Sequence, residues 1–114
     1  MRNEKYNQLI TKLLNATSEG RLSWEQTNQE NEYQVTIGDN MVLISGPRRS
    51  IGFNVNLEME NMSVAIVNVD GVEIDRQKVE PSDPSYNVFM ELCDRVRKIC
   101  YKVDETLQDI INEV

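Results

Sequence analysis

The sequence predicts a single α+β domain over residues 1–114. Three observations predict it: apolar residues recur with a helical period near the N-terminus, segments with a period of two follow, and a second helical stripe fills the C-terminal part. Strands joined by short turns and bracketed by helices are typical of this class. We expect an N-terminal helix, a five- or six-stranded antiparallel meander sheet and a long C-terminal helix, with both helices on one face of the sheet.

The first element is a helix that begins after Asn3, a residue type that caps helix N-termini well. Its apolar residues follow the spacing of one buried stripe: Tyr6, Leu9, Ile10, Leu13 and Leu14. Gly20 is expected to close this helix, because glycine readily adopts the left-handed conformation found there. Trp24 then alternates with polar neighbours, which predicts an edge strand with the indole facing the core. The alternative is an exposed tryptophan that serves as a binding residue.

The first predicted hairpin lies between residues 33 and 44, and in its first strand Tyr33, Val35 and Ile37 alternate with polar neighbours. A turn is expected at residues 38–40 because glycine, aspartate and asparagine tolerate positive φ. A two-residue loop at 39–40 predicts two pairs on the core face, Ile37 with Val42 and Val35 with Ile44.

The outer face of the same hairpin carries two further apolar residues. Met41 and Leu43 alternate with the residues assigned to the core, so they point to the opposite face of the sheet. Apolar side chains on an outer sheet face are typical of contact surfaces, and we expect these two to contribute to an interface.

A second hairpin is centred on Asp70 and Gly71, a pair that favours a two-residue loop. Residues 51–59 precede it and show the most regular alternation in the chain, which predicts another strand. The two-residue loop predicts three pairs on the core face: Val69 with Val72, Val67 with Ile74 and Ala65 with Arg76. This assignment places Val64 and Ile66 on the outer face, with Ile66 available for an interface.

The C-terminal segment predicts a long helix that starts near Asp83 and Pro84. Its apolar residues follow one heptad seam: Phe89, Cys93, Val96, Cys100, Val103, Leu107, Ile110 and Val114. A continuous helix over 84–114 would be about 45 Å long, whereas an eight-residue strand reaches only about 27 Å. The helix must therefore break, with Asp104 as a possible cap, or fray, or be covered by a second chain. We expect a homodimer in which the C-terminal half of this helix contacts the partner copy.

Three short motifs resemble a loose group of small uncharacterised bacterial α+β proteins. They are the T-x-x-G-x-L-x-W segment from Thr17 to Trp24, the Asp70-Gly71 hairpin with VEID, and the terminal L-x-x-x-x-R and VDETLQDII pattern. The resemblance covers most of the chain. It implies a bacterial origin and an α+β fold, and it carries over neither an activity nor a functional residue.

The charge balance and the missing histidine exclude several functions. The chain has 12 basic and 19 acidic residues, a formal net charge of -7, so neither nucleic acids nor anionic membranes are expected partners. It contains no histidine, which removes Ser-His and Cys-His nucleophilic pairs and imidazole zinc ligands. We therefore expect no enzyme, no cofactor and no metal site. Without an apolar leader or span, we expect a cytoplasmic protein with Cys93 and Cys100 reduced.

Two sets of residues are candidate sites. The interface set is apolar: Leu107, Ile110, Ile111, Val114, Met41, Leu43 and Ile66. The ligand set is Trp24, Arg48 and Arg49, because arginine side chains bind carboxylates and phosphates. The favoured hypothesis is a non-catalytic, protein-binding accessory module that is dimeric. The alternatives are a small-ligand-binding domain with a pocket between sheet and helices, and an acidic dimer resembling export chaperones.

Overall fold

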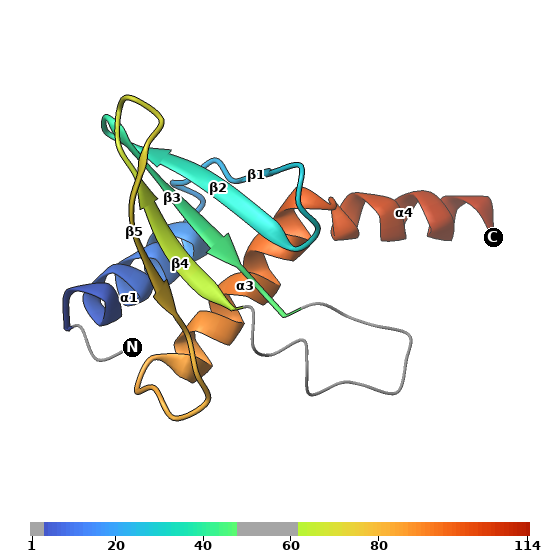
Figure 1. The fold of residues 1–114 in the computed structure, drawn as a ribbon. Coiled ribbons are helices and arrows are strands. Elements are labelled where there is room, and N and C mark those ends of the chain that lie inside the picture. Colours follow the sequence, from blue (N-terminus) through green and yellow to red (C-terminus); the bar gives the residue numbers. More distant parts are fainter. Residues whose placement is uncertain (1–3, 48–61) are drawn as a thin grey trace.

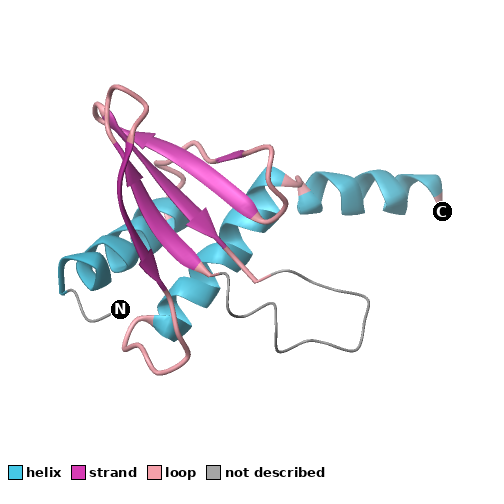
Figure 2. Cartoon of the chain, viewed as in Figure 1, coloured by secondary structure: helices cyan, strands magenta, loops and turns pink. Residues whose placement is uncertain are grey.

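A computed structural model of the protein describes residues 4–47 and 62–114 (Figure 1). Its elements, in chain order, are α1 (Glu4–Ser18), β1 (Glu25–Gln26), β2 (Glu32–Ile37), β3 (Asn40–Ser45), β4 (Ser63–Val67), β5 (Glu73–Lys78), α3 (Tyr86–Cys100) and α4 (Val103–Glu113). The predicted α+β class is confirmed (Figure 2). The strand predicted at 51–59 lies outside the described residues, as do Arg48 and Arg49.

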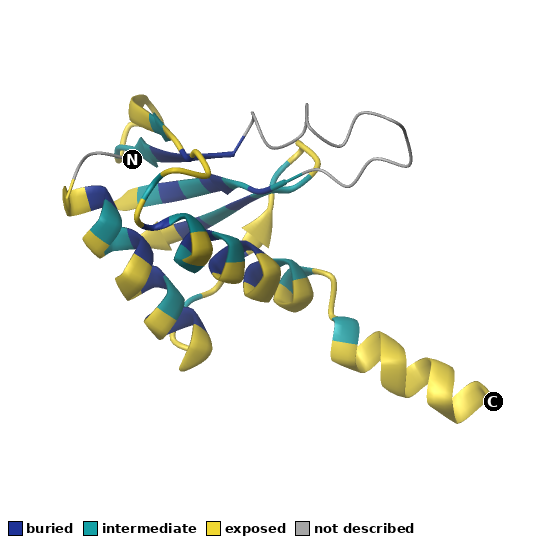
Figure 3. Ribbon diagram, turned by 90° about the horizontal axis from the view of Figure 1, so that it is seen from below, coloured by how far each residue is buried: buried dark blue, intermediate teal, exposed yellow. Residues whose placement is uncertain are grey.

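The five strands form one antiparallel meander sheet in the order β1-β2-β3-β4-β5. α1 and α3 pack against each other and cover the same face of this sheet, as predicted (Figure 3). α4 follows α3 and leads away from the sheet (Figure 1). Within the described residues, none of the helices is long and apolar enough to cross a membrane.

α1 forms and ends as its sequence predicts. Its apolar stripe faces the core, with three residues buried and two partly buried: Tyr6, Ile10 and Leu13, then Leu9 and Leu14. Gly20 has a φ of +73°, which is the left-handed conformation expected of it. The backbone N–H of Arg21 then donates to the carbonyl of Ala16 at 3.0 Å and closes the helix.

Trp24 occupies the core, as predicted, with 6% of its surface exposed. It lies directly before β1, an edge strand of only two residues. Its indole Nε1 donates to Oγ1 of Thr17 at 2.9 Å, and this hydroxyl donates to the carbonyl of Leu13 at 2.6 Å. These hydrogen bonds join the start of the sheet to the last turns of α1.

The register predicted for the β2–β3 hairpin is wrong by two residues, although its core face is right. The loop is Gly38-Asp39, and the observed pairs are Ile37 with Asn40, Val35 with Val42 and Tyr33 with Ile44. Gly38 belongs to the predicted turn, and as the first residue of the observed loop it has a positive φ of +62°. A shift of two leaves every side chain on its predicted face because the side-chain period of a strand is two. Ile37 is displaced toward the hairpin tip and is exposed.

The β4–β5 hairpin has a three-residue loop, where the sequence predicted two residues. The backbone N–H of Asn68 donates to the carbonyl of Val72 at 2.9 Å, and Gly71 in the loop has a φ of +79°. A bulge then leaves Ile74 without a partner and restores the predicted pairing of Ala65 with Arg76. The pairs predicted nearer the turn, Val69 with Val72 and Val67 with Ile74, are therefore wrong.

The face assigned to β4 is also wrong. Val64 pairs with Ile44 and Ile66 pairs with Val42, so both lie on the helix-covered face. Val64 is completely buried, and Ile66 packs against the core, which removes Ile66 from the predicted outer interface. β4 carries apolar residues on both faces, so its sequence pattern does not show which face is the core side.

The C-terminal helix breaks after Cys100, which is one of the three outcomes predicted. α4 begins at Val103, and Lys102 between the two helices has the left-handed φ of 52°. Lys102 occupies the N-cap position that the sequence suggested for Asp104. The break redirects the chain, so α4 contains no buried residue.

The start of α3 also differs from the prediction. The helix begins at Tyr86 with Ser85 as its N-cap, two residues after the predicted cap Asp83. The Asp83 carboxylate instead accepts a hydrogen bond of 2.6 Å from the backbone N–H of Glu80. It therefore stabilises the preceding turn rather than the helix end.

Candidate functional site

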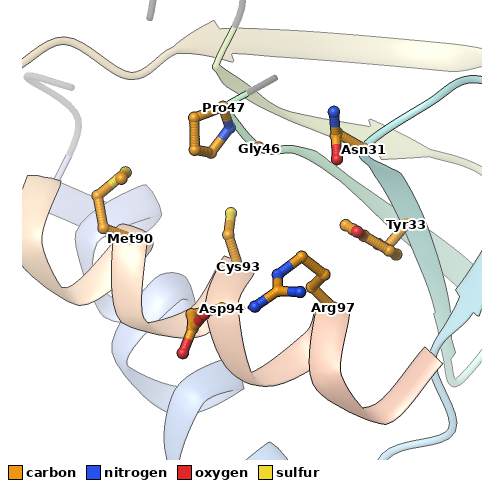
Figure 4. A pocket seen from close by; sticks show the side chains of 8 residues that line it. All are labelled: Asn31, Tyr33, Gly46, Pro47, Met90, Cys93, Asp94 and Arg97. Carbon is orange, nitrogen blue, oxygen red and sulfur yellow. Dashed lines mark hydrogen bonds and ion pairs between the residues drawn. The ribbon is translucent and has the colours of Figure 1, made fainter. Parts of the chain in front are cut away.

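A pocket of about 250 Å³ lies between α3 and the neighbouring ends of β2 and β3 (Figure 4). Its lining residues are Asn31, Tyr33, Gly46, Pro47, Met90, Cys93, Asp94 and Arg97. The four residues from α3 are spaced three, one and three apart, so they share one side of the helix. The sheet and this side of α3 together form the walls.

Gly46 determines how closely the end of β3 approaches α3. A Cβ atom on this residue would lie only 3.3 Å from the Cβ of Cys93. The Gly46 backbone N–H donates to the carbonyl of Asn31 at 2.9 Å, which fixes the two strand ends together. Asn31 itself has a φ of 59°, a conformation that asparagine adopts more readily than most residues.

The charged wall of the pocket is an ion-pair network on α3. Nη2 of Arg97 lies 3.2 Å from Oδ1 of Asp94, and Nζ of Lys98 lies 3.0 Å from Oδ2 of the same carboxylate. Hydrogen bonds from Lys98 and Arg97 hold the pKa of Asp94 below its usual range. Asp94 therefore remains ionised and shares its charge between two cations.

Tyr33 and Cys93 form the buried part of the lining. Tyr33 is 1% exposed, and burial raises the pKa of its phenol above the ordinary value. Burial likewise raises the pKa of the Cys93 thiol, so it stays protonated and is a poor nucleophile near neutral pH. Cys93 and Cys100 are both free.

A second candidate surface is the apolar face of α4. Its residues Leu107, Ile110 and Ile111 are between 52% and 65% exposed, and Val114 at its end is fully exposed. These four predicted interface residues therefore share one exposed surface. Asp104 and Glu113 flank this face, and Glu105 and Asp109 lie on the opposite side of the helix.

A groove runs along α1 and the segment that follows it. Its lining is mainly apolar: Leu9, Lys12, Leu13, Asn15, Ala16, Glu19, Arg21, Leu22 and Ile37. Arg21 pairs with Glu19 at 2.6 Å, whereas Lys12 has no ion pair among the described residues. The groove is thus an apolar surface with an available cation at its edge.

The remaining predicted residues do not join these sites. Met41 and Leu43 lie on the sheet face that no described helix covers, beside Ala65 and Val67. Trp24 is a core residue and is not part of the pocket lining. In the described part of the chain, no group of three or more acidic or cysteine side chains is arranged to hold a metal ion.

Sequence reasoning missed the residues that line the pocket. Tyr33 was treated only as part of an alternating strand segment, and Arg97 was not singled out. The sequence did contain a signal for this site. Asp94 and Arg97 are three residues apart, so they lie on the same side of α3, next to its buried positions. The approach of Gly46 to that side depends on tertiary structure and left no local pattern.

No family model, curated protein or solved structure matches this chain. The resemblance to small bacterial α+β proteins therefore stays a prediction.

Proposed function

We propose that the protein is a non-catalytic, protein-binding accessory module that acts as a homodimer through α4. The observation that carries this proposal is an amphipathic helix without a single buried residue. An isolated helix of this length is marginal in water. Full burial of a leucine or isoleucine side chain is worth about 1.5–3 kcal/mol, and those of α4 forgo roughly half of this because they are 52–65% exposed. A partner surface would bury the apolar side chains of α4, which the sheet of the same chain does not cover.

The partner that we propose is a second copy, whose α1 groove receives α4 in a reciprocal exchange. At 100° per residue, Asp104 and Glu113 flank the apolar face of α4 on opposite sides. A direct contact between two α4 helices would bring these acidic flanks together, which is unfavourable. The groove instead offers apolar contacts and the cation of Lys12. Reciprocal docking gives a closed two-fold dimer, the commonest oligomer.

The first experiment compares two charge-matched variants of α4 by sedimentation equilibrium at micromolar concentration. The unmutated chain should have twice the monomer mass, and Leu107→Lys with Ile110→Lys should have the monomer mass. Gln108→Lys with Asn112→Lys adds the same two charges on the opposite side of the helix and should remain dimeric. A monomeric unmutated chain, or equal behaviour of the two variants, would contradict the proposal.

A second experiment identifies the surface that receives α4. Lys12→Glu with Ile37→Glu places two carboxylates in the groove, at side chains that are already exposed, and should also give monomers. Mixing this groove variant with the α4 variant leaves one intact α4 and one intact groove, so heterodimers should form. If two α4 helices paired directly, the groove variant would dimerise alone and mixing would restore nothing.

A small-ligand-binding domain is the second candidate function, and the specific observation that favours it is the Tyr33 hydroxyl beside the pocket. Both candidates are compatible with one chain, since the pocket and α4 use different residues. Two free thiols support a reducing compartment, so we propose the cytoplasm.

A further inference from the structure

The Tyr33 hydroxyl is a buried polar group whose hydrogen-bonding capacity is unused within residues 4–47 and 62–114. The residue is 1% exposed, and none of the described residues forms a hydrogen bond with its oxygen. Buried tyrosine hydroxyls normally find a partner, because an unpaired polar group away from water is unfavourable. Figure 4 shows this hydroxyl turned toward the side chains of Cys93 and Arg97. An occupant of the pocket would give it a partner.

Arg97 provides a positive charge on the same side of the pocket. Its guanidinium has five N–H donors, and among the described residues it makes one hydrogen bond, from Nη2 to Asp94. Asp94 is also bound by Lys98, so it neutralises Arg97 only in part. The side chain is 28% exposed, which keeps the guanidinium accessible from the pocket while reducing its contact with water.

The pocket has two ends of different chemistry. Figure 4 shows Asn31, Tyr33 and Arg97 at one end, and Met90 and Pro47 at the other. The first end offers hydrogen-bond donors and a cation, whereas the second is apolar. The volume of about 250 Å³ is slightly below the range of roughly 300–1,000 Å³ that is usual for drug-sized ligands. The occupant must therefore be small, with one anionic and one apolar end.

We propose that this pocket binds a small monocarboxylate, whose carboxylate contacts Arg97 and Tyr33 and whose tail contacts Met90 and Pro47. The planar guanidinium fits a carboxylate through parallel hydrogen bonds, and the phenol donates a further one. A doubly charged anion suits the site less well, because Asp94 offsets part of the positive charge. This inference rests on the second candidate function and is independent of association through α4.

The test uses the full chain, with sodium benzoate as the probe and benzamide as its uncharged counterpart. Amide resonances are followed by NMR during titration at constant ionic strength. Benzoate should cause saturable shifts confined to residues 31–33, 46 and 93–97, and benzamide should bind about tenfold more weakly because it lacks the charge. Inorganic phosphate should bind more weakly than benzoate at the same residues.

Two pocket variants and one control assign the contacts. Arg97→Gln should weaken benzoate binding about tenfold. Tyr33→Phe should weaken it about threefold while leaving the protein at least as stable, because the lost hydroxyl has no partner in the described part of the chain. Arg95→Gln removes an arginine of the same helix that pairs with Glu91 outside the pocket, and it should bind benzoate normally.

The possible results separate the inference from the function on which it rests. Saturable binding of benzamide as strong as that of benzoate would overturn the carboxylate class but keep a ligand-binding pocket. Tighter binding of phosphate would likewise overturn that class. Absence of saturable shifts with all three probes would overturn both. Benzoate binding that is unchanged in Arg97→Gln would show that the predicted contact is wrong.

Discussion

The indole of Trp24 is hydrogen-bonded to the hydroxyl of Thr17, 2.9 Å away, inside the core. The pair joins the C-terminal turn of α1 to the residue that precedes the sheet. Gly20, between them, turns the chain with its positive φ. The segment from Leu13 to Trp24 is thus a structural corner.

Loss of this contact should destabilise the protein in a graded way. Trp24→Ala should cost about 3–5 kcal/mol, as for other large buried aromatic residues. Thr17→Val should cost about 1–3 kcal/mol, because it leaves the indole N–H buried without a partner. Urea unfolding measures both, and the tryptophan emission of the unmutated protein should be blue-shifted. Emission like that of free tryptophan would contradict the core position.

A matched control exists on the same helix. Thr11 also donates its hydroxyl to a carbonyl four residues earlier, that of Asn7, but it is exposed. Thr11→Val should therefore change the free energy of unfolding by less than about 0.5 kcal/mol. A similar loss in Thr11→Val and Thr17→Val would mean that helix propensity, not the indole contact, explains the effect.

A second prediction concerns the hydrogen bond of 2.6 Å from the Tyr6 hydroxyl to Oδ2 of Asp75. This bond is the main reason why the pKa of Asp75 lies below its ordinary value of 3.8. A depressed folded-state pKa stabilises the protein above the unfolded pKa, and this contribution is lost as the pH falls through the folded value. Tyr6→Phe should therefore raise the pKa of Asp75 and reduce this acid-sensitive part of the stability.

Titration of the aspartate carboxyl carbons by NMR measures this change residue by residue. Asp94 is the internal control, because its pKa is lowered by Lys98 and Arg97 on another helix. Its titration should be the same in the unmutated chain and in Tyr6→Phe. An Asp75 titration that Tyr6→Phe leaves unchanged would show that the phenol does not control this carboxylate.

The third prediction is that the two thiols differ in reactivity. Burial raises the pKa of both, but Cys93 is 5% exposed while Cys100 is only half-buried. A thiol reagent at pH 8 should label Cys100 first and Cys93 more slowly, and both quickly after denaturation. Cys100→Ser isolates the slow site. Rapid labelling of Cys93 in the native Cys100→Ser variant would contradict its burial.

The extent to which sequence predicted the sheet depends on how clearly each strand alternates. Val35 lies between two polar residues, so the core face of β2 was identified even though the turn was misplaced. Val42 lies between Met41 and Leu43, so its face followed only from its predicted pairing across the hairpin. Val64 and Ile66 belong to a run of apolar residues, and both faces of such a strand satisfy the pattern. Pairing with β3 decides the face, and that long-range contact is not encoded in local spacing.

The break between α3 and α4 also lacks a local signal. Tyr101 and Lys102 separate the helices, and neither residue type is a usual helix breaker. The sequence did reveal that a helix of such length exceeds the sheet, so a break was among the outcomes considered. Which outcome occurs depends on where the sheet stops supporting α3, and that is a property of the packed structure.

The last prediction follows from α4, none of whose residues is buried. Its backbone amides should exchange rapidly with deuterium in the monomer, because a short helix without tertiary contacts opens frequently. Docking on a second copy would slow this exchange, so protection of residues 103–113 should rise with protein concentration. Mass spectrometry of peptides from dilute and concentrated samples measures this, and α3 should show no comparable change.

In Leu107→Lys with Ile110→Lys, exchange in α4 should be rapid at both concentrations. Rapid exchange of α4 in the unmutated protein at high concentration would show that its apolar face has no partner copy.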